Sequence, residues 1–269
     1  MRISRCLPKE WPSRFLPRWG SLNGEGMFRA RAWDVNEKGD RMSTIEWARR
    51  IGSAVLPPLC CLCGARGQAT ALDLCDVCAT FLPVLDEPCR PGWEPEDVFG
   101  SGTLLRTLFL YKYQYPVDHF IRRLKFDGER VYARLLGVLM ARARLGLGGT
   151  LPGCIVPIPL HRQRFRERGF NQAQEIARYA AAELGIRVES RVLARMLATK
   201  EQSGLSVDAR RRNIRGAFEV VGAVPTGTIA LLDDVVTTGS TAREAFEALR
   251  AAGAQDVELW AAARVERDV

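Results

Sequence analysis

The second half of the chain alternates between two hydrophobic periods, and these periods predict its elements. Short apolar runs predict strands at residues 154–158, 218–221, 229–232 and 257–262. Apolar residues recurring every three or four positions predict helices between them, at residues 171–185 and 242–253, each ending in glycine. Strands that alternate with helices are typical of an α/β fold with a mostly parallel sheet flanked by helices.

The middle of the chain contains further candidate elements. The segment 103–115 is rich in Leu, Phe and Tyr and predicts a core strand, or a wall against the second half of the chain. Its aromatic residues beside Lys112 would also suit stacking on single-stranded nucleic acid. A short helix is expected at 118–125 and an amphipathic helix at 132–146.

The first residues of the chain show neither period. Residues 1–41 carry nine basic and five acidic side chains and three of the six tryptophans. We expect a flexible extension, or a start codon at Met1 placed upstream of a native start at Met42, with a basic arm for nucleic acid as the alternative. A capping box at Ser43 and Glu46 predicts the first helix. The expected domains are therefore 1–42, 43–100 and 101–269.

Composition and charge narrow the class of protein. A chain that is 47% hydrophobic and 26% charged is not disordered throughout. The net charge of +8 favours anionic partners such as phosphate esters, pyrophosphate or nucleic acid. No apolar run approaches the about 18 residues that span a bilayer, so we expect a soluble cytoplasmic protein without membrane insertion. With eight cysteines and two histidines, a reducing compartment indicates bound metal before disulfides.

Four of the cysteines have the spacing of a metal site. Cys60 and Cys63 form one C-x2-C pair, and Cys75 and Cys78 form a second. Two such turns facing each other build a tetrahedral site that zinc(II) prefers, and four protein ligands leave no open position, so the zinc would be structural. A redox pair, an iron–sulfur cluster and chance are the alternatives. Cys61 competes with Cys63 as a ligand.

The strand predicted at 229–232 ends in two carboxylates, Asp233 and Asp234. Adjacent acids at the carboxyl end of a strand can accept hydrogen bonds from the vicinal hydroxyls of a ribose. A solvated strand end followed by an ordinary helix cap is the alternative. A turn that leads into a helix can hold a phosphate through its hydroxyls and the helix amides. The candidates in that turn are Val236, Thr237, Thr238, Gly239, Ser240 and Thr241.

Two common nucleotide and hydrolase motifs are missing from the chain. It contains no G-x-x-x-x-G-K-[ST] and no G-x-S-x-G sequence, which excludes P-loop nucleotidases and serine hydrolases with a nucleophile elbow.

The string IALLDDVVTTGST at 229–241 resembles the phosphoribosyl pyrophosphate signature of type I phosphoribosyltransferases. Three more segments resemble the ComF family in particular: LKFDG at 124–128, VPIPLHRQRFRERGFNQ at 156–172, and RMLATKEQSGL at 195–205. The paired C-x2-C motifs before them complete the pattern. The resemblance covers about residues 43–265 and leaves out the first part of the chain.

The resemblance implies a type I phosphoribosyltransferase-like fold with an N-terminal zinc knuckle. It also implies binding of phosphoribosyl pyrophosphate with Mg²⁺, transfer to an unknown acceptor, and a link to DNA uptake in competent bacteria. Asp233 and Asp234 would be the catalytic acids. By family analogy the loop after Ile158 takes the pyrophosphate, with Arg164 and Arg168 as candidates; a solvated or nucleic-acid-facing surface is the alternative. The remaining candidates would lie in a flexible loop over the substrate: Gln202, Arg210 and Asn213.

A second hypothesis requires no catalysis. The chain would then be a DNA-uptake accessory protein that retains the fold and binds single-stranded DNA or DNA-uptake proteins. The surplus of arginine and lysine is compatible with both hypotheses.

Overall fold

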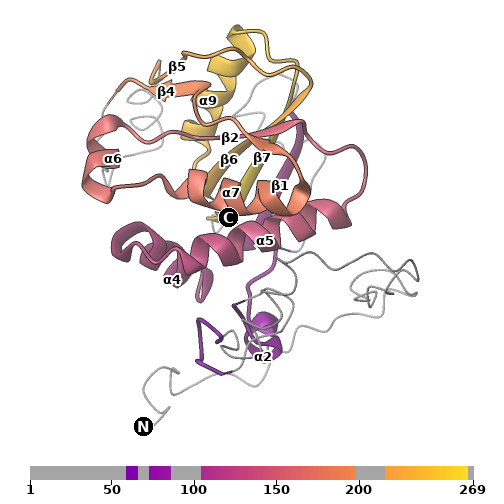
Figure 1. Cartoon of the computed structure of the whole chain (residues 1–269), viewed down its shortest axis with the longest axis vertical. Coiled ribbons are helices and arrows are strands. Elements are labelled where there is room, and N and C mark those ends of the chain that lie inside the picture. The colour runs from indigo at the N-terminus through magenta and orange to yellow at the C-terminus, as the bar shows by residue number, and fades with distance from the viewer. Residues whose placement is uncertain (1–58, 66–72, 86–103, 198–215, 266–269) are drawn as a thin grey trace, which may run out of the picture. The chain divides into compact units, whose positions relative to one another are not determined.

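The computed structural model describes residues 59–65, 73–85, 104–197 and 216–265 (Figure 1). All of them belong to one compact unit formed by residues 42–269. Several sequence-based predictions lie outside the described residues: the extension 1–42, the helix expected at Ser43, and the loop residues Gln202, Arg210 and Asn213. Among the described residues, no helix is both long and apolar enough to cross a membrane.

A parallel sheet forms the centre of the fold. Its five strands lie in the order β1 (Leu104–Lys112), β7 (Asp256–Arg264), β6 (Thr228–Val236), β2 (Cys154–Pro157) and β3 (Arg187–Val188). Every neighbouring pair runs parallel, which confirms the predicted α/β class. Strands β6 and β7 are longer than their apolar runs, because each continues through polar residues at its carboxyl end. The two-residue strand β3 is too short to show a period and was not predicted.

A second, smaller sheet consists of β4 (Leu193–Arg195) and β5 (Phe218–Val220), which pair antiparallel. The strand predicted at 218–221 is thus confirmed, but it is not part of the parallel sheet. An apolar run of three or four residues has the same appearance in either setting, so its period could not distinguish them.

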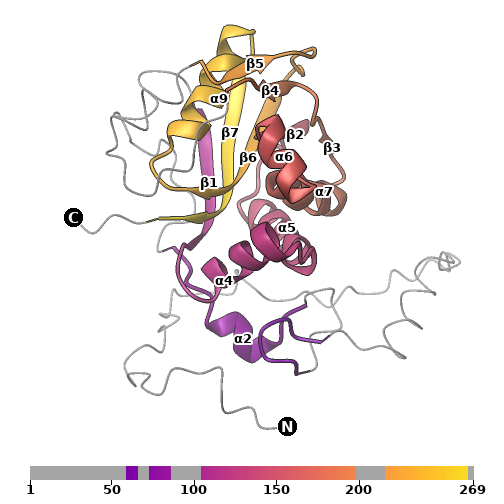
Figure 2. The ribbon, with the colours of Figure 1, turned by 90° about the vertical axis from the view of Figure 1, so that its left-hand side faces the viewer.

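Helices cover both faces of the parallel sheet (Figure 2). Helices α5 (Val131–Gly146) and α7 (Gln172–Leu184) pack on one face and α9 (Ser240–Ala251) on the other. The other helices of the described residues are α2 (Asp76–Thr80), α4 (Val117–Arg122), the π-helix η1 (Arg123–Asp127) and α6 (Arg162–Arg168). Helix α6 was not predicted, because five of its seven residues are charged and none is buried. It is bounded by His161, whose side chain accepts from the Gln163 amide, and by Gly169 in the left-handed conformation.

The alternation of side chains along β7 separates two hydrophobic cores. Trp260 and the other side chains on its face of β7 pack with α5 and α7, whereas Leu259 on the opposite face packs with α9. Helices α5 and α7 approach closely at Gly137. A Cβ added there would lie 2.6 Å from the carbonyl oxygen of Ile176 and 2.7 Å from Cβ of Tyr179, so only glycine fits without movement of α7.

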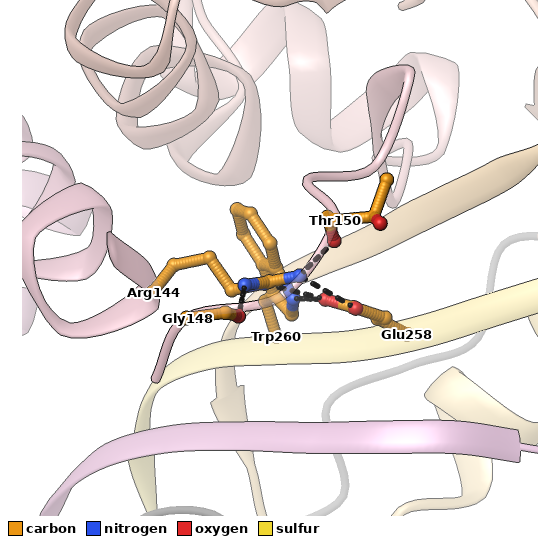
Figure 3. A network of polar contacts seen from close by, with 5 residues as sticks. All are labelled: Arg144, Gly148, Thr150, Glu258 and Trp260. Atoms are coloured by element: carbon orange, nitrogen blue, oxygen red, sulfur yellow. Dashed lines mark hydrogen bonds and ion pairs between the residues drawn. The ribbon is translucent and has the colours of Figure 1, made fainter. Parts of the chain in front are cut away.

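A buried ion pair joins α5 to the sheet (Figure 3). Arg144 is 1% exposed and Glu258 on β7 is 4% exposed. Arg144 donates from Nε and Nη2 to the two Glu258 oxygens, at 3.0 and 3.1 Å. It also donates to the carbonyls of Gly148 and Thr150, and Trp260 Nε1 donates to Glu258 at 2.9 Å. Five hydrogen bonds therefore satisfy two buried charges and fix the connection from α5 to β2.

Removal of one partner should strongly destabilise the fold. Glu258→Gln leaves the Arg144 charge buried without a counter-ion, and we expect the free energy of unfolding to fall by about 3–5 kcal/mol in urea denaturation. Arg123→Met is the control, because Arg123 pairs with Asp127 and Glu129 at the surface. Its loss should be much smaller, because exposed ion pairs contribute little to stability. Equal losses in the two variants would contradict this assignment.

Candidate functional site

The carboxyl ends of β2 and β6 meet at a change of direction in the sheet. The strands are neighbours, with Pro157 opposite Leu232. The chain leaves β2 toward α7 on one face and leaves β6 toward α9 on the other, since α7 and α9 belong to different cores. Open α/β sheets bind their ligands in the crevice at such a point. A cavity of about 140 Å³ lies there, and its polar lining consists of Lys125, Arg164, Arg168, Asn171, Gln172, Arg195, Asp233, Asp234 and Thr241.

The two predicted acids share this cavity. Their carboxylates accept from the amides that follow them: Asp234 N donates to Asp233 at 2.8 Å, and Val235 N donates to Asp234 at 2.7 Å. Burial, and then the charge of Asp234, raise the pKa of Asp233 to about 7. Two carboxylates so close together therefore oppose each other's ionisation unless a cation or a hydrogen-bond donor faces them.

One cation already faces the acid pair. Lys125 Nζ lies 2.9 Å from Asp234 Oδ2, and both side chains are largely buried. Burial lowers the pKa of Lys125, but the charge of Asp234, the hydrogen bond to it and the charge of Asp233 together raise the pKa overall, so the lysine stays charged. Lys125 comes from η1, far from Asp234 in the sequence. The sequence predicted no role for Lys125, although it lies in LKFDG at 124–128, one of the segments that resemble the ComF family.

Helix α6 brings two predicted arginines to the cavity. Arg164 and Arg168 are four residues apart, so they lie on one face of the helix, and both are half-buried. Arg168 donates to Gln172 Oε1 at 3.2 Å and lies over the Phe126 ring, 5.7 Å from its centre. The prediction that these arginines and the acids form one site in space is therefore consistent with the structure, while pyrophosphate binding stays a prediction.

A third arginine was not predicted as a site residue. Arg195 at the end of β4 lines the cavity and lies over the Phe218 ring at 5.5 Å. Burial, and then the positive charge of Arg164, lower its pKa. Arg195 is the first residue of RMLATKEQSGL, a segment that resembles the ComF family but indicated no role for this arginine. Cations that crowd together in this way favour an anionic ligand.

The turn before α9 contains the predicted phosphate residues. Gly239 has φ +75° and begins the helix, a conformation that favours glycine. The hydroxyls of Thr238 and Ser240 lie 2.9 Å apart. Thr241 lines the cavity. The other candidates of the turn are not among the lining residues: Val236, Thr237, Thr238, Gly239 and Ser240.

The four predicted cysteine ligands converge at a second site. The sulfur atoms of Cys60, Cys63, Cys75 and Cys78 all lie within 4.8 Å of one another. Tetrahedral zinc with Zn–S bonds of about 2.3 Å needs sulfurs about 3.8 Å apart, so the set fits a structural zinc ion. Cys61 is outside this group.

The cysteine cluster is anchored to α5. Asp73, 4% exposed, accepts from Arg134 through both carboxylate oxygens, with Nε 2.7 Å from Oδ2. The Tyr132 hydroxyl donates to the carbonyl of Cys61 at 3.4 Å. Cys60 and Cys78 are buried in the same hydrophobic core as α5 and α7. The knuckle and the sheet domain are therefore packed together in this part of the chain.

Comparison with known proteins agrees with the motifs, although no family model matches the chain. Competence protein F of Haemophilus influenzae is 30% identical over 214 residues, which cover 75% of this chain and 89% of that protein. The DNA utilization protein YhgH of Salmonella typhi is 32% identical over 226 residues, covering 78% of this chain and 98% of that protein.

Among solved structures, glutamine phosphoribosylpyrophosphate amidotransferase from B. subtilis covers 48% of this chain and 25% of its own, with 21% identity and a TM-score of 0.34. A score this low assigns no substrate or residue role to the present chain. The two relatives by sequence, by contrast, are matched over nearly their whole length. The resemblance drawn from the motifs is thereby confirmed, and the chain belongs to the ComF family of competence and DNA utilization proteins.

Proposed function

We propose that this protein binds phosphoribosyl pyrophosphate with Mg²⁺ in the cavity at the ends of β2 and β6, and that it acts in DNA uptake. The relatives named for competence and DNA utilization support the second half of the proposal. One observation carries the first half: an adjacent acid pair and four cationic side chains line the same cavity. The acceptor of any transferred phosphoribosyl group is unknown.

The chemistry of the lining matches the parts of this ligand. The carboxylates of Asp233 and Asp234 suit the vicinal ribose hydroxyls. The guanidinium forks of Arg164 and Arg168 suit the oxygen array of a pyrophosphate. The turn before α9 suits the 5′-phosphate, because it opens into a helix N-terminus.

The acid pair also fits a divalent cation. Mg²⁺ prefers oxygen ligands and usually binds through one or two carboxylates together with substrate phosphates. Asp233 and Asp234 would hold it, and the ion would neutralise charge on the phosphates. In a transfer reaction the bond from the anomeric carbon to pyrophosphate breaks, and Arg164 and Arg168 would stabilise the departing negative charge.

Loss of one acid should weaken ligand binding without unfolding the protein. Calorimetric titration with phosphoribosyl pyrophosphate and Mg²⁺ should give a Kd that rises about tenfold or more in Asp233→Asn, because charged hydrogen bonds to the ribose are lost. Arg162→Met with Arg166→Met is the matched control, since both arginines are exposed on the far side of α6. Its Kd should equal that of the wild type.

Thermal melting at pH 8 tests whether Asp233→Asn is still folded. The pKa of Asp233 is raised on folding, so its ionisation destabilises the fold as the pH rises toward about 7 and does so fully above it. Asp233→Asn removes this cost and leaves the pair of Lys125 with Asp234 intact. Its Tm should therefore be at least that of the wild type. Wild-type protein that does not bind, or an Asn variant that binds equally well, would overturn the proposal.

The four cysteines are proposed to hold structural zinc. Purified protein should contain about one zinc per chain, measured by atomic emission, and Cys63→Ser should lose it and melt at a lower temperature. Cys61→Ser is the matched control and should keep the metal, because Cys61 is outside the cluster. Iron in place of zinc, or loss of metal from both variants, would refute this assignment.

A second candidate function is binding of single-stranded DNA without catalysis. Its support is a basic surface with exposed aromatics near the cavity: Phe126 is 67% exposed and Phe165 is 46% exposed, the latter between Arg162 and Arg166 on α6. Bases stack on such rings, and arginines track the backbone.

The two faces of α6 allow the candidates to be tested separately. Arg162→Met with Arg166→Met should weaken binding of an oligothymidine, in fluorescence anisotropy, by about tenfold at low salt, and should flatten the dependence of affinity on salt. Affinity for phosphoribosyl pyrophosphate should not change. A wild-type affinity that is independent of salt would rule out the DNA surface.

A further inference from the structure

One polar atom in the cavity wall has no partner that the fold supplies. Gln172 is 1% exposed, and its Nε2 has no hydrogen-bond acceptor among the described residues. Buried amide groups are nearly always satisfied, because an unmade hydrogen bond opposes folding. The donor lies at the first residue of α7, where the helix dipole is positive.

The orientation of the Gln172 amide follows from its neighbour. Arg168 Nη1 lies 3.2 Å from Oε1, and a guanidinium can only donate, so the atom facing it must be the oxygen. The nitrogen therefore points away from Arg168. A flipped amide would place two donors against each other and is excluded.

Gln172 lines the cavity, together with Arg164 and Arg168. An amide N–H beside two guanidinium groups can be satisfied by an oxygen that carries negative charge. Neither Asp233 nor Asp234 accepts from it, because Nε2 has no acceptor among the described residues.

We propose that Gln172 Nε2 donates a hydrogen bond to a non-bridging oxygen of the pyrophosphate group of the ligand. This inference rests on the proposed function and adds a residue to it. Pyrophosphate is favoured over the 5′-phosphate because Gln172 contacts Arg168 on the β2 side of the cavity, whereas the turn before α9 follows β6. In this arrangement Nε2 of Gln172 donates to the ligand, and Oε1 of Gln172 accepts from Arg168.

A double-mutant cycle shows whether Gln172 contacts the ligand directly or acts only by positioning Arg168. Gln172→Met, Arg168→Met and the double variant are titrated with magnesium pyrophosphate, ribose 5-phosphate and phosphoribosyl pyrophosphate. If Gln172 only positions Arg168, the methionine at 172 has no further effect once Arg168 is removed. If it contacts the ligand, affinity falls in both backgrounds.

We expect Gln172→Met to weaken pyrophosphate and phosphoribosyl pyrophosphate binding about tenfold, with and without Arg168, and to leave ribose 5-phosphate binding unchanged. Its Tm should equal or exceed that of the wild type, because a buried unpaired donor is removed. Gln163→Met is the control: Gln163 is exposed and pairs with Glu167 at 2.9 Å, so binding should not change. If the methionine variant does not fold, Gln172→Leu removes the same atoms.

The outcomes separate this inference from the function on which it rests. Wild-type protein that binds none of the three ligands overturns both. Wild-type binding with an unchanged affinity in Gln172→Met overturns the role of Gln172 alone, as does an effect that vanishes in the Arg168→Met background. A loss confined to ribose 5-phosphate overturns the assignment to pyrophosphate.

Discussion

The parallel pairing of β2 with β6 is the constraint on which the site depends. Parallel strands must be joined by crossovers, and here the two crossovers pass over opposite faces of the sheet. The carboxyl ends of the two strands are consequently left open beside each other. Much of the cavity wall comes from this edge: α6 and α7 after β2, and the acid pair at the end of β6 with the start of α9. Lys125 from η1 and Arg195 from β4 complete it.

The cavity brings side chains of both charges together. Lys125 offsets Asp234, but Arg164, Arg168 and Arg195 gather around the same space, and Asp233 is held where ionisation is unfavourable. A titratable group perturbed by burial and by a neighbouring charge is typical of functional sites. By contrast, the buried pair of Arg144 with Glu258 is satisfied by hydrogen bonds of its own, which marks it as structural.

Local patterns predicted the elements that bury apolar side chains. Strands β2, β6 and β7 and helices α5, α7 and α9 each contribute a regular apolar face, so their periods were visible. Helix α6 has no buried residue, so no hydrophobic period predicted it. It is bounded instead by its caps at His161 and Gly169. The grouping of the cysteines was predictable because each pair lies within one turn.

The long-range part of the site could not be predicted in the same way. Lys125 meets Asp234, and Arg195 lies near both Arg164 and Asp233, only because the sheet brings distant segments together. Gln172 was visible as part of a motif, but its unpaired donor depends on the position of Arg168. Spacing along the chain carries no information about such pairs.

The contact at Gly137 links the packing of α5 to the position of α7. A single methyl group at this position would collide with the backbone of α7, and relief would require a shift of one helix against the other. The first residue of α7 is Gln172, in the wall of the cavity. The absence of a side chain on α5 therefore helps to hold in place an element that carries part of the cavity wall.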